Sequence, residues 1–178
     1  MNHIAEIDQP TFETVRPLIV RAELQSIRLS KCRIDTNPPR DAAYEGDVSI
    51  DLSTKASGKR MGEKLWCVFT FNLNATNQSP TPRPLAISLQ LEAIYIVPSE
   101  LSFSAKQIHA FVRTNGMLNV WPYWREFVQS VTGRAGLPPL TLPLFRIRIL
   151  PKTKVAQQAP QLATEPPSIS EPQSQREG

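Results

Sequence analysis

The side chains that most often bind metals are few in this chain and far apart in sequence. It has two cysteines, Cys32 and Cys67, two histidines, His3 and His109, and no CxxC pair. Structural zinc sites take four such ligands at short, defined spacings, so the sequence predicts no metal site. His109 lies in a helix-like pattern with no second metal-type side chain nearby, which favours a place on a helix surface.

Motifs for covalent or phosphate chemistry are absent as well. The sequence has no glycine-rich phosphate loop and no nucleophile elbow, and its carboxylates are spread over predicted strands and loops, where solvated charge is their ordinary role. Two histidines leave little capacity for general acid–base catalysis. We therefore expect a protein that is not an enzyme and that uses no cofactor.

Charge and hydropathy argue against a nucleic-acid-binding protein and against a membrane-inserted or secreted protein. Lys and Arg number 20 against 16 Asp and Glu, but they are scattered along the chain without a basic run or interleaved aromatic residues. Nucleic-acid binding is therefore not expected. No stretch reaches membrane-spanning length, and acidic and polar residues interrupt the amino terminus where a signal peptide would be apolar. These features predict a cytoplasmic protein with reduced thiols and no membrane insertion.

Four segments alternate apolar and polar residues, as half-buried β-strands do. They are residues 22–36, 44–54, 65–75 and 85–97. In the first, the apolar period slips by one residue between Leu24 and Ile27, which predicts a β-bulge. A turn is expected at residues 57–62. Short polar loops predict that the strands pair antiparallel in sequence order, as a meander.

A helical period begins after Ser104. Ser104 with Gln107 fits a capping box, and Asn115 with Gly116 fits a helix stop. The next segment carries one broad apolar stripe at spacings of three and four, made of Leu118, Trp121, Trp124, Phe127, Val128 and Val131. Pro122 suits either the first turn of a second helix or a kink in one longer helix.

The apolar stripe is larger than one small sheet needs. Aromatic and aliphatic residues at helical spacing usually form core. Two of the three tryptophans, however, flank Tyr123 within one turn, and a loop rich in leucine and proline follows at residues 137–143. Part of this surface is therefore expected to face a partner chain or a bound polypeptide.

The two ends of the chain differ from its middle. Residues 1–20 have no sustained period and predict a loosely ordered arm, whereas residues 21–151 predict the folded domain. Near its end, residues 145–149 alternate apolar side chains with arginines, which predicts a short strand with a basic face. Residues 152–178 are mostly Gln, Pro, Ser, Ala, Thr and Glu and predict a disordered tail.

The aromatic helix and its loop resemble the SecB family of export chaperones. NVWPYWREFV followed by GRAGLPPLTLP is similar to the family's N-x-L-F-P-Y-A-R-E helix, glycine and proline–leucine loop. The matching positions are Pro122, Tyr123, Arg125, Glu126, Pro138, Leu140 and Leu142. The resemblance spans residues 22–143, by layout in the strands and by motif in the last third.

This resemblance implies an α+β fold in which a long C-terminal helix packs on a four-stranded antiparallel sheet. It also implies a homotetramer, a dimer of dimers, with apolar grooves that hold unfolded polypeptides without ATP. Expected client-groove residues are Trp66, Phe69, Phe71, Trp121, Tyr123, Trp124, Leu137 and Leu140. Expected oligomer-interface residues are Leu118, Arg125, Glu126 and Phe127.

Three departures from the export chaperones bear on partners. Export SecB proteins are acidic and often end in a basic Cys/His tail that engages the SecA motor, whereas this chain is basic and its tail lacks both residues. The family's second carboxy-terminal helix is replaced by the FRIRIL run and the tail. These departures argue against SecA as a partner and favour a dedicated client, such as the labile antitoxins that some SecB-like proteins protect.

Two other readings of the chain remain open. The first is a non-catalytic assembly module whose apolar stripe only forms an oligomer. The second is nucleic-acid binding through Arg146, Arg148, Lys152 and Lys154.

Overall fold

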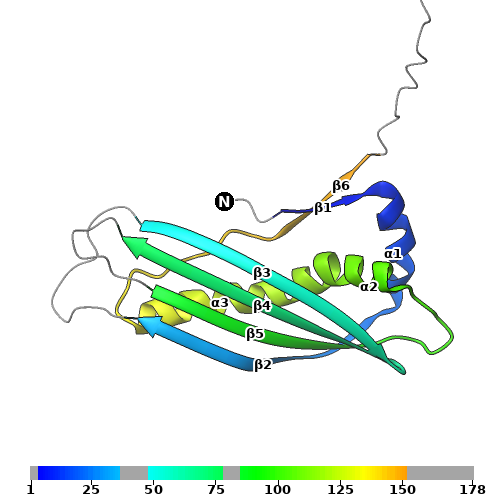
Figure 1. Cartoon of the computed structure of the whole chain (residues 1–178), viewed down its shortest axis with the longest axis horizontal. Helices are drawn as coiled ribbons and strands as arrows, with labels where there is room; N and C mark the ends of the chain where they lie inside the picture. The colour runs from blue at the N-terminus through cyan, green and yellow to red at the C-terminus, as the bar shows by residue number, and fades with distance from the viewer. Residues whose placement is uncertain (1–3, 37–47, 78–84, 152–178) are drawn as a thin grey trace, which may run out of the picture.

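The computed structural model describes residues 4–36, 48–77 and 85–151 of the chain. In order, the elements are β1 (Ile4–Asp8), α1 (Gln9–Arg21), β2 (Glu23–Thr36), β3 (Val48–Met61), β4 (Lys64–Asn77), β5 (Leu85–Ile96), α2 (Ala105–Phe111), the π-helical turn η1 (Val112–Gly116), α3 (Met117–Arg134) and β6 (Arg146–Leu150). Figure 1 shows β2 to β5 as one sheet with the helical run from α2 to α3 along one face. The predicted α+β class and long C-terminal helix are confirmed.

The strand order differs from a simple meander. All four strands pair antiparallel, but their order is β2-β5-β4-β3. The prediction was right for β3, β4 and β5, and wrong for β2, which pairs with the last strand of the sheet. An alternating pattern determines which face of a strand is buried, but it carries no information about the neighbouring strand. The sheet therefore has β2 and β3 as its two edges.

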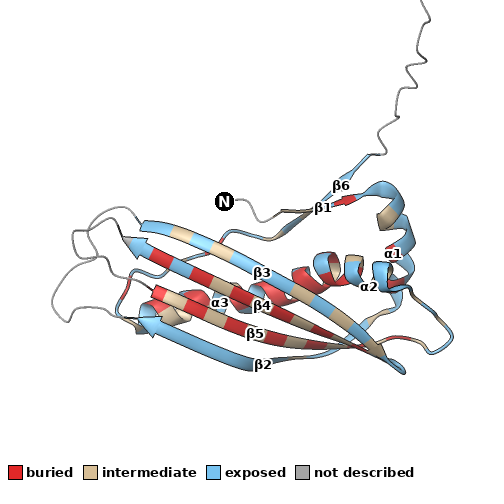
Figure 2. Cartoon of the chain, viewed as in Figure 1, coloured by how far each residue is buried: buried red, intermediate tan, exposed pale blue. Residues whose placement is uncertain are grey.

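Burial alternates along the two central strands, as predicted. In β5 every second residue from Leu85 is buried, and β4 buries Leu65, Cys67, Phe69, Phe71 and Leu73 on the same face. Figure 2 shows this banding on β4 and β5, whereas the edge strands are mostly exposed. The core therefore lies between the central strands and the helical run.

The two edge strands depart from the expected boundaries. The predicted bulge in β2 is present as a register shift between Leu24 and Ser26, and a second shift follows between Leu29 and Lys31. The turn expected at residues 57–62 was wrong for residues 57–61, because β3 continues to Met61 and only Gly62, at a φ of 62°, turns the chain. Residues 44–47 of the second predicted strand lie outside the described residues.

Gly58 serves the packing of β3 rather than a turn. A Cβ at this position would lie 2.7 Å from Val112 Cγ2 and 3.1 Å from Ile108 Cγ2. Such a distance is well inside van der Waals contact, so only glycine lets the helical run approach this edge so closely. Gly58, which suggested a loop in the sequence, is therefore the position of a close helix–strand contact.

The capping box is confirmed, and the predicted helix stop is wrong. The Ser104 side chain accepts from the Gln107 amide, and the Gln107 side chain accepts from the Ser104 amide. At Asn115 and Gly116 the helix passes through η1 and continues into α3 without ending. A Cβ on Gly116 would lie 3.0 Å from Phe69 Cζ, so this glycine permits a close crossing of the sheet. Pro122 lies inside the longer helical run, beyond the first turn of α3.

Residues 4–20 form regular structure, so the expectation of a loosely ordered arm over residues 1–20 was wrong for them. β1 pairs in parallel with β6, and α1 follows at once. The Asp8 carboxylate caps α1 by accepting from the Thr11 amide at 2.8 Å, and this bond lowers the Asp8 pKa. Val15 and Leu18 of α1 are buried. A five-residue strand is too short to show a period, which is why the pattern missed it.

The remaining predictions for the ends have mixed outcomes. Residues 146–150 form the predicted short strand, and their partner β1 was not predicted. The predicted disordered tail, residues 152–178, lies outside the described residues, and the domain boundaries remain predictions. None of the described helices is both long and apolar enough to cross a membrane.

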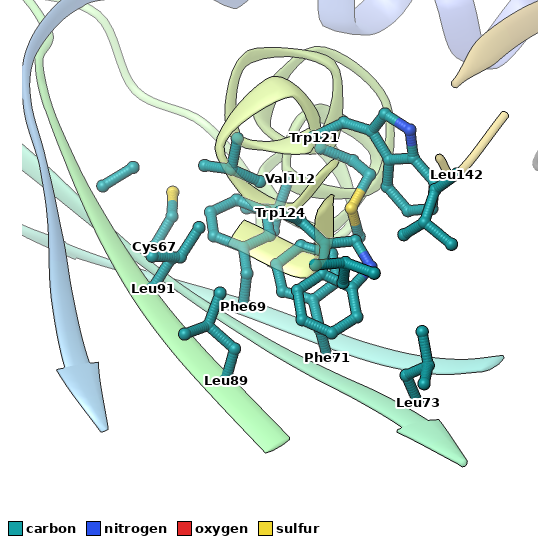
Figure 3. Close-up of a cluster of buried hydrophobic side chains, with 14 of the residues drawn as sticks. Cys67, Phe69, Phe71, Leu73, Leu89, Leu91, Val112, Trp121, Trp124 and Leu142 are labelled. Carbon is teal, nitrogen blue, oxygen red and sulfur yellow. The ribbon is translucent and has the colours of Figure 1, made fainter. Parts of the chain in front are cut away.

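The aromatic stripe of α3 fills the centre of the core. Trp124 stacks on Phe71 with ring centroids 5.2 Å apart and an interplanar angle of 14°. Trp121 meets the same ring edge-on at 6.0 Å. Figure 3 shows Leu142 beside the Trp121 ring, with Cys67, Phe69, Phe71 and Leu73 on the strands of the sheet. The helix and β4 are thus joined by aromatic contacts.

Replacing Trp124 with Ala is expected to lower the free energy of unfolding by about 3–5 kcal/mol, because the ring is fully buried and its removal leaves a cavity. Tyr123→Ala, at the neighbouring residue whose side chain is 52% exposed, is expected to cost less than about 1 kcal/mol. Trp124→Phe should fall between them. Urea denaturation measures all three, and equal costs for Trp124→Ala and Tyr123→Ala would contradict this core.

Gly58→Ala is expected to destabilise the fold by about 1–3 kcal/mol, because the new methyl group overlaps Val112. Gly133→Ala provides the matched control. Gly133 lies within α3, and a Cβ there would be 4.0 Å from Pro139. The substitution is therefore expected to raise the free energy of unfolding by about 0.5–1 kcal/mol. Thermal and urea unfolding compare the two, and a neutral Gly58→Ala would exclude the close contact.

Candidate polypeptide-binding groove

The eight residues expected to line a client groove do not lie together. Phe69, Phe71 and Trp124 are each 0% exposed and belong to the core. They offer no surface to a bound chain, so we no longer assign them to a groove. Tyr123, on the opposite side of α3 from the core, is mostly exposed. Trp121 lies between these extremes, packed in the core on one side and bordering a cavity on the other.

Trp66 lies on the sheet face opposite the helices, among the half-buried positions of β4. The guanidinium carbon of Arg28 lies 5.5 Å from its ring centroid, and Arg28 also pairs with Glu92 at 2.6 Å. The Trp66 indole nitrogen is buried, with no hydrogen-bond partner among the described residues. This surface is separate from the helix-side groove and does not extend it.

Three hydrogen bonds hold the proline–leucine loop, residues 137–143, against α3, and in each of them the α3 partner is a side chain. Trp121 Nε1 donates to the Pro143 carbonyl at 2.9 Å, and Arg125 Nε donates to the Leu142 carbonyl at 2.7 Å. The Leu140 amide donates to Thr132 Oγ1 at 3.0 Å. Arg125, one of the expected interface residues, therefore has a role within its own chain. The loop is a fixed wall beside the helix.

The leucines of this loop and the other expected interface residues differ in how far their side chains are exposed. Leu137 is buried and Leu140 is half-buried, both against the core cluster. Leu118, at 42% exposed, and Glu126 are accessible, and Phe127 is half-buried. These three can therefore be reached by another chain, which the interface prediction requires.

A cavity of about 430 Å³ opens between β1, the edge of β3 and the helical run. Its lining comprises Ile4, Ala5, Thr54, Lys55, Ala56, His109, Arg113, Met117, Trp121 and Phe145. The Trp121 and Phe145 rings, 5.5 Å apart, form its aromatic end. This volume falls in the range of sites that hold a small ligand or one or two side chains.

A second cavity, of about 500 Å³, continues the first along the same strand. Residues 56–60 of β3 line it with Ala105, Ile108 and His109. The two cavities share Ala56 and His109. Together they make one depression along residues 54–60, which we call the β3-edge groove.

The β3-edge groove lies beside an unpaired strand edge. β3 is bonded to β4 on one side only, and no described strand pairs with its other edge. Such an edge presents a row of free N–H and C=O groups, which can bind an extended chain as an added strand. Sequence reasoning missed this feature because it depends on strand order. The predicted groove residue that borders it is Trp121.

The rim of the groove is basic. Lys55, His109 and Arg113 are exposed, and neither Lys55 nor Arg113 makes an ion pair with a described residue. No side chain in the lining of either cavity is acidic. The groove therefore combines an apolar end, free backbone groups and unpaired cations.

Groups with altered pKa values lie in the core, away from the groove. Burial raises the pKa of the Cys67 thiol to about 12 and is the main cause that raises the Tyr95 pKa to about 12. Both groups are neutral at physiological pH and face packed side chains. Among the described residues, no three His, Cys, Asp or Glu side chains gather as a metal site would require.

Comparison with known proteins extends this description. No protein-family model matches the chain. Two curated relatives, the SecB-like chaperones Rv1957 and MT2006 of two Mycobacterium tuberculosis strains, are each 42% identical over 40 residues, which is 22% of this chain and 22% of each relative. The sequence match thus covers about a fifth of those proteins.

The structural match is much broader. The solved structure of Mycobacterium tuberculosis Rv1957, a SecB-like chaperone in complex with a ChAD peptide from the HigA1 antitoxin, superposes with a TM-score of 0.66 at 22% identity. It covers 76% of this chain and 98% of that chain. The chain therefore has the SecB-like chaperone fold, which confirms the resemblance to the SecB family found in its sequence.

Proposed function

We propose that this chain is an ATP-independent holdase that binds an unfolded or labile client polypeptide in the β3-edge groove. The observation that carries this proposal is the open edge of β3 beside a cavity with an aromatic end, on a SecB-like fold. An extended client gains backbone hydrogen bonds from the strand edge, and its apolar side chains fill the cavities. We propose that this occurs in the cytoplasm and involves no catalysis.

Holding without ATP follows from the modest size of each contact. Each apolar side chain that leaves water contributes about 1.5–3 kcal/mol when fully buried. One client segment therefore binds weakly and reversibly, and several segments on one chain reinforce each other through effective concentration. Such a groove needs no conformational cycle to release a client that folds, because folding removes the exposed segment.

A dedicated client fits this chain better than general export. The similar structure from Mycobacterium tuberculosis contains an antitoxin peptide. This chain is basic, with 20 Lys and Arg against 16 Asp and Glu, whereas the export chaperones that it resembles are acidic. We therefore propose a labile antitoxin or similar regulatory protein as the client, and we do not propose SecA as a partner.

An oligomer is proposed from the uncovered face of β2. Leu24, Leu29 and Ile34 are 43%, 53% and 40% exposed although their strand partners on β5 face the core. A row of exposed apolar residues at a sheet edge is costly in water unless another chain covers it. With Leu118, Glu126 and Phe127 of α3, this row is the proposed contact of a homotetramer built as a dimer of dimers.

The alternative is a non-catalytic assembly module that uses these surfaces only to associate with itself. The exposed row on β2 is compatible with both functions, whereas the β3-edge groove favours the holdase. Client binding therefore separates them.

The test is aggregation of a chemically unfolded model protein, and of a candidate antitoxin, with and without this chain in the absence of ATP. Wild type is expected to suppress aggregation at near-stoichiometric ratios. Phe145→Ala, which removes the half-buried ring at the aromatic end of the groove, should raise the required concentration about tenfold, because roughly 1.5 kcal/mol of apolar contact is lost.

Leu144→Ala is the matched control, because this neighbouring side chain is 60% exposed and lies outside the lining of the groove. It should protect clients as well as wild type does. If wild type associates with itself yet leaves every client unprotected, the assembly module replaces the holdase.

A further inference from the structure

We infer that the β3-edge groove selects client segments in which an apolar anchor is accompanied by acidic side chains two and four residues away on the same side of an extended chain. This inference rests on the proposed function and names the class of segment that the groove accepts. Three features support it: a regular row of helix residues, a change from apolar to basic along that row, and the absence of acidic lining.

The helix side of the first cavity is a regular row. His109, Arg113, Met117 and Trp121 all line it, and each follows the previous one by four residues. An α-helix rises about 1.5 Å per residue, so Met117 and Trp121 lie about 6 Å apart along the axis, and the steps from His109 to Met117 pass through the π-helical turn η1. Two residues of an extended chain span about 6.6 Å. Alternate side chains of a client along the groove therefore meet successive members of the row.

The row changes character along its length. Met117 and Trp121 form an apolar end with Phe145. Arg113 and His109 follow from the helix, whereas Lys55 of β3 pairs with Thr70 and lies on the sheet face opposite the helices. A client anchor seated at Met117 and Trp121 thus places its second neighbour at Arg113 and its fourth neighbour at His109.

Charge complementarity identifies what those neighbours are. Arg113 has no anionic partner among the described residues, and no lining residue is acidic. The nearest carboxylate on β1, Glu6, already pairs with Arg148 at 3.4 Å. Of the other lining cations, Arg60 is occupied by the carbonyls of Gly62, Leu101 and Pro98, and Lys59 pairs with Trp66 on the sheet face opposite the helices. A client carboxylate meets the unpaired Arg113 guanidinium here, and a client lysine meets like charge.

The experiment measures binding of short fluorescent peptides to the full chain by anisotropy at low and high salt. Each peptide has one Trp anchor and, two and four residues away, either two Glu, two Gln or two Lys, with the anchor placed first or last. The Glu peptide is expected to bind about threefold to tenfold more tightly than the Gln peptide at low salt, and the Lys peptide more weakly still. Salt should reduce this preference, because the pairs are exposed.

Charge reversal in the protein provides the decisive comparison. Arg113→Glu should invert the order, so that the Lys peptide binds more tightly than the Glu peptide. Lys31→Glu is the control of equal net charge, because Lys31 lies on β2 at the opposite edge of the sheet. It should leave the order unchanged.

Two results would overturn the inference: equal binding of Glu and Gln peptides, or loss of the preference in Lys31→Glu as much as in Arg113→Glu. If peptides bind without regard to charge while wild type still protects clients from aggregation, only the acidic preference fails. If wild type binds no peptide and protects no client, the holdase function fails with it.

Discussion

The structure depends on one contact, the packing of the α2–α3 helical run against the buried face of β4. Trp124 lies flat on Phe71, and Gly116 passes over Phe69 with no room for a side chain. Stacked aromatic rings bury large areas and add a directional preference, so they determine the position of the helix along the strand. Gly58 extends the same close approach to the edge strand β3. Without this contact the sheet would have an uncovered apolar face.

The groove is a consequence of that packing. Because the helical run lies so close to β3, the row from His109 to Trp121 becomes the floor beside an open strand edge. The proline–leucine loop is hydrogen-bonded to α3 through Trp121 and Arg125, so it packs beside the helix and leaves the edge of β3 open. The same aromatic residues therefore stabilise the fold and shape its surface. Substitutions that separate these roles must lie at the rim, at Phe145 or Arg113, rather than in the core.

The proposed binding surface has an aromatic end and a basic end, which fits the proposal that a client is held and then released. An exposed ion pair contributes little energy by itself, so apolar burial supplies most of the affinity and charge supplies discrimination. This division lets a dedicated client be distinguished from the many apolar segments of other unfolded chains.

The sequence by itself determined most of the elements between residues 22 and 150, their buried faces and the SecB resemblance, because periodicity and caps are local properties. The alternation of β5, the bulge near Leu24 and the capping box at Ser104 follow from residues close together in the chain. Tertiary structure alone decided that β2 pairs with β5, that Phe69 and Trp124 are core, and that Gly58 and Gly116 serve close packing instead of turns. It also created the β3-edge groove, since a free edge and a cavity arise only when distant segments are assembled. The apolar–polar pattern of the sequence specifies whether a residue prefers to be buried or exposed, and only packing specifies which residues it contacts.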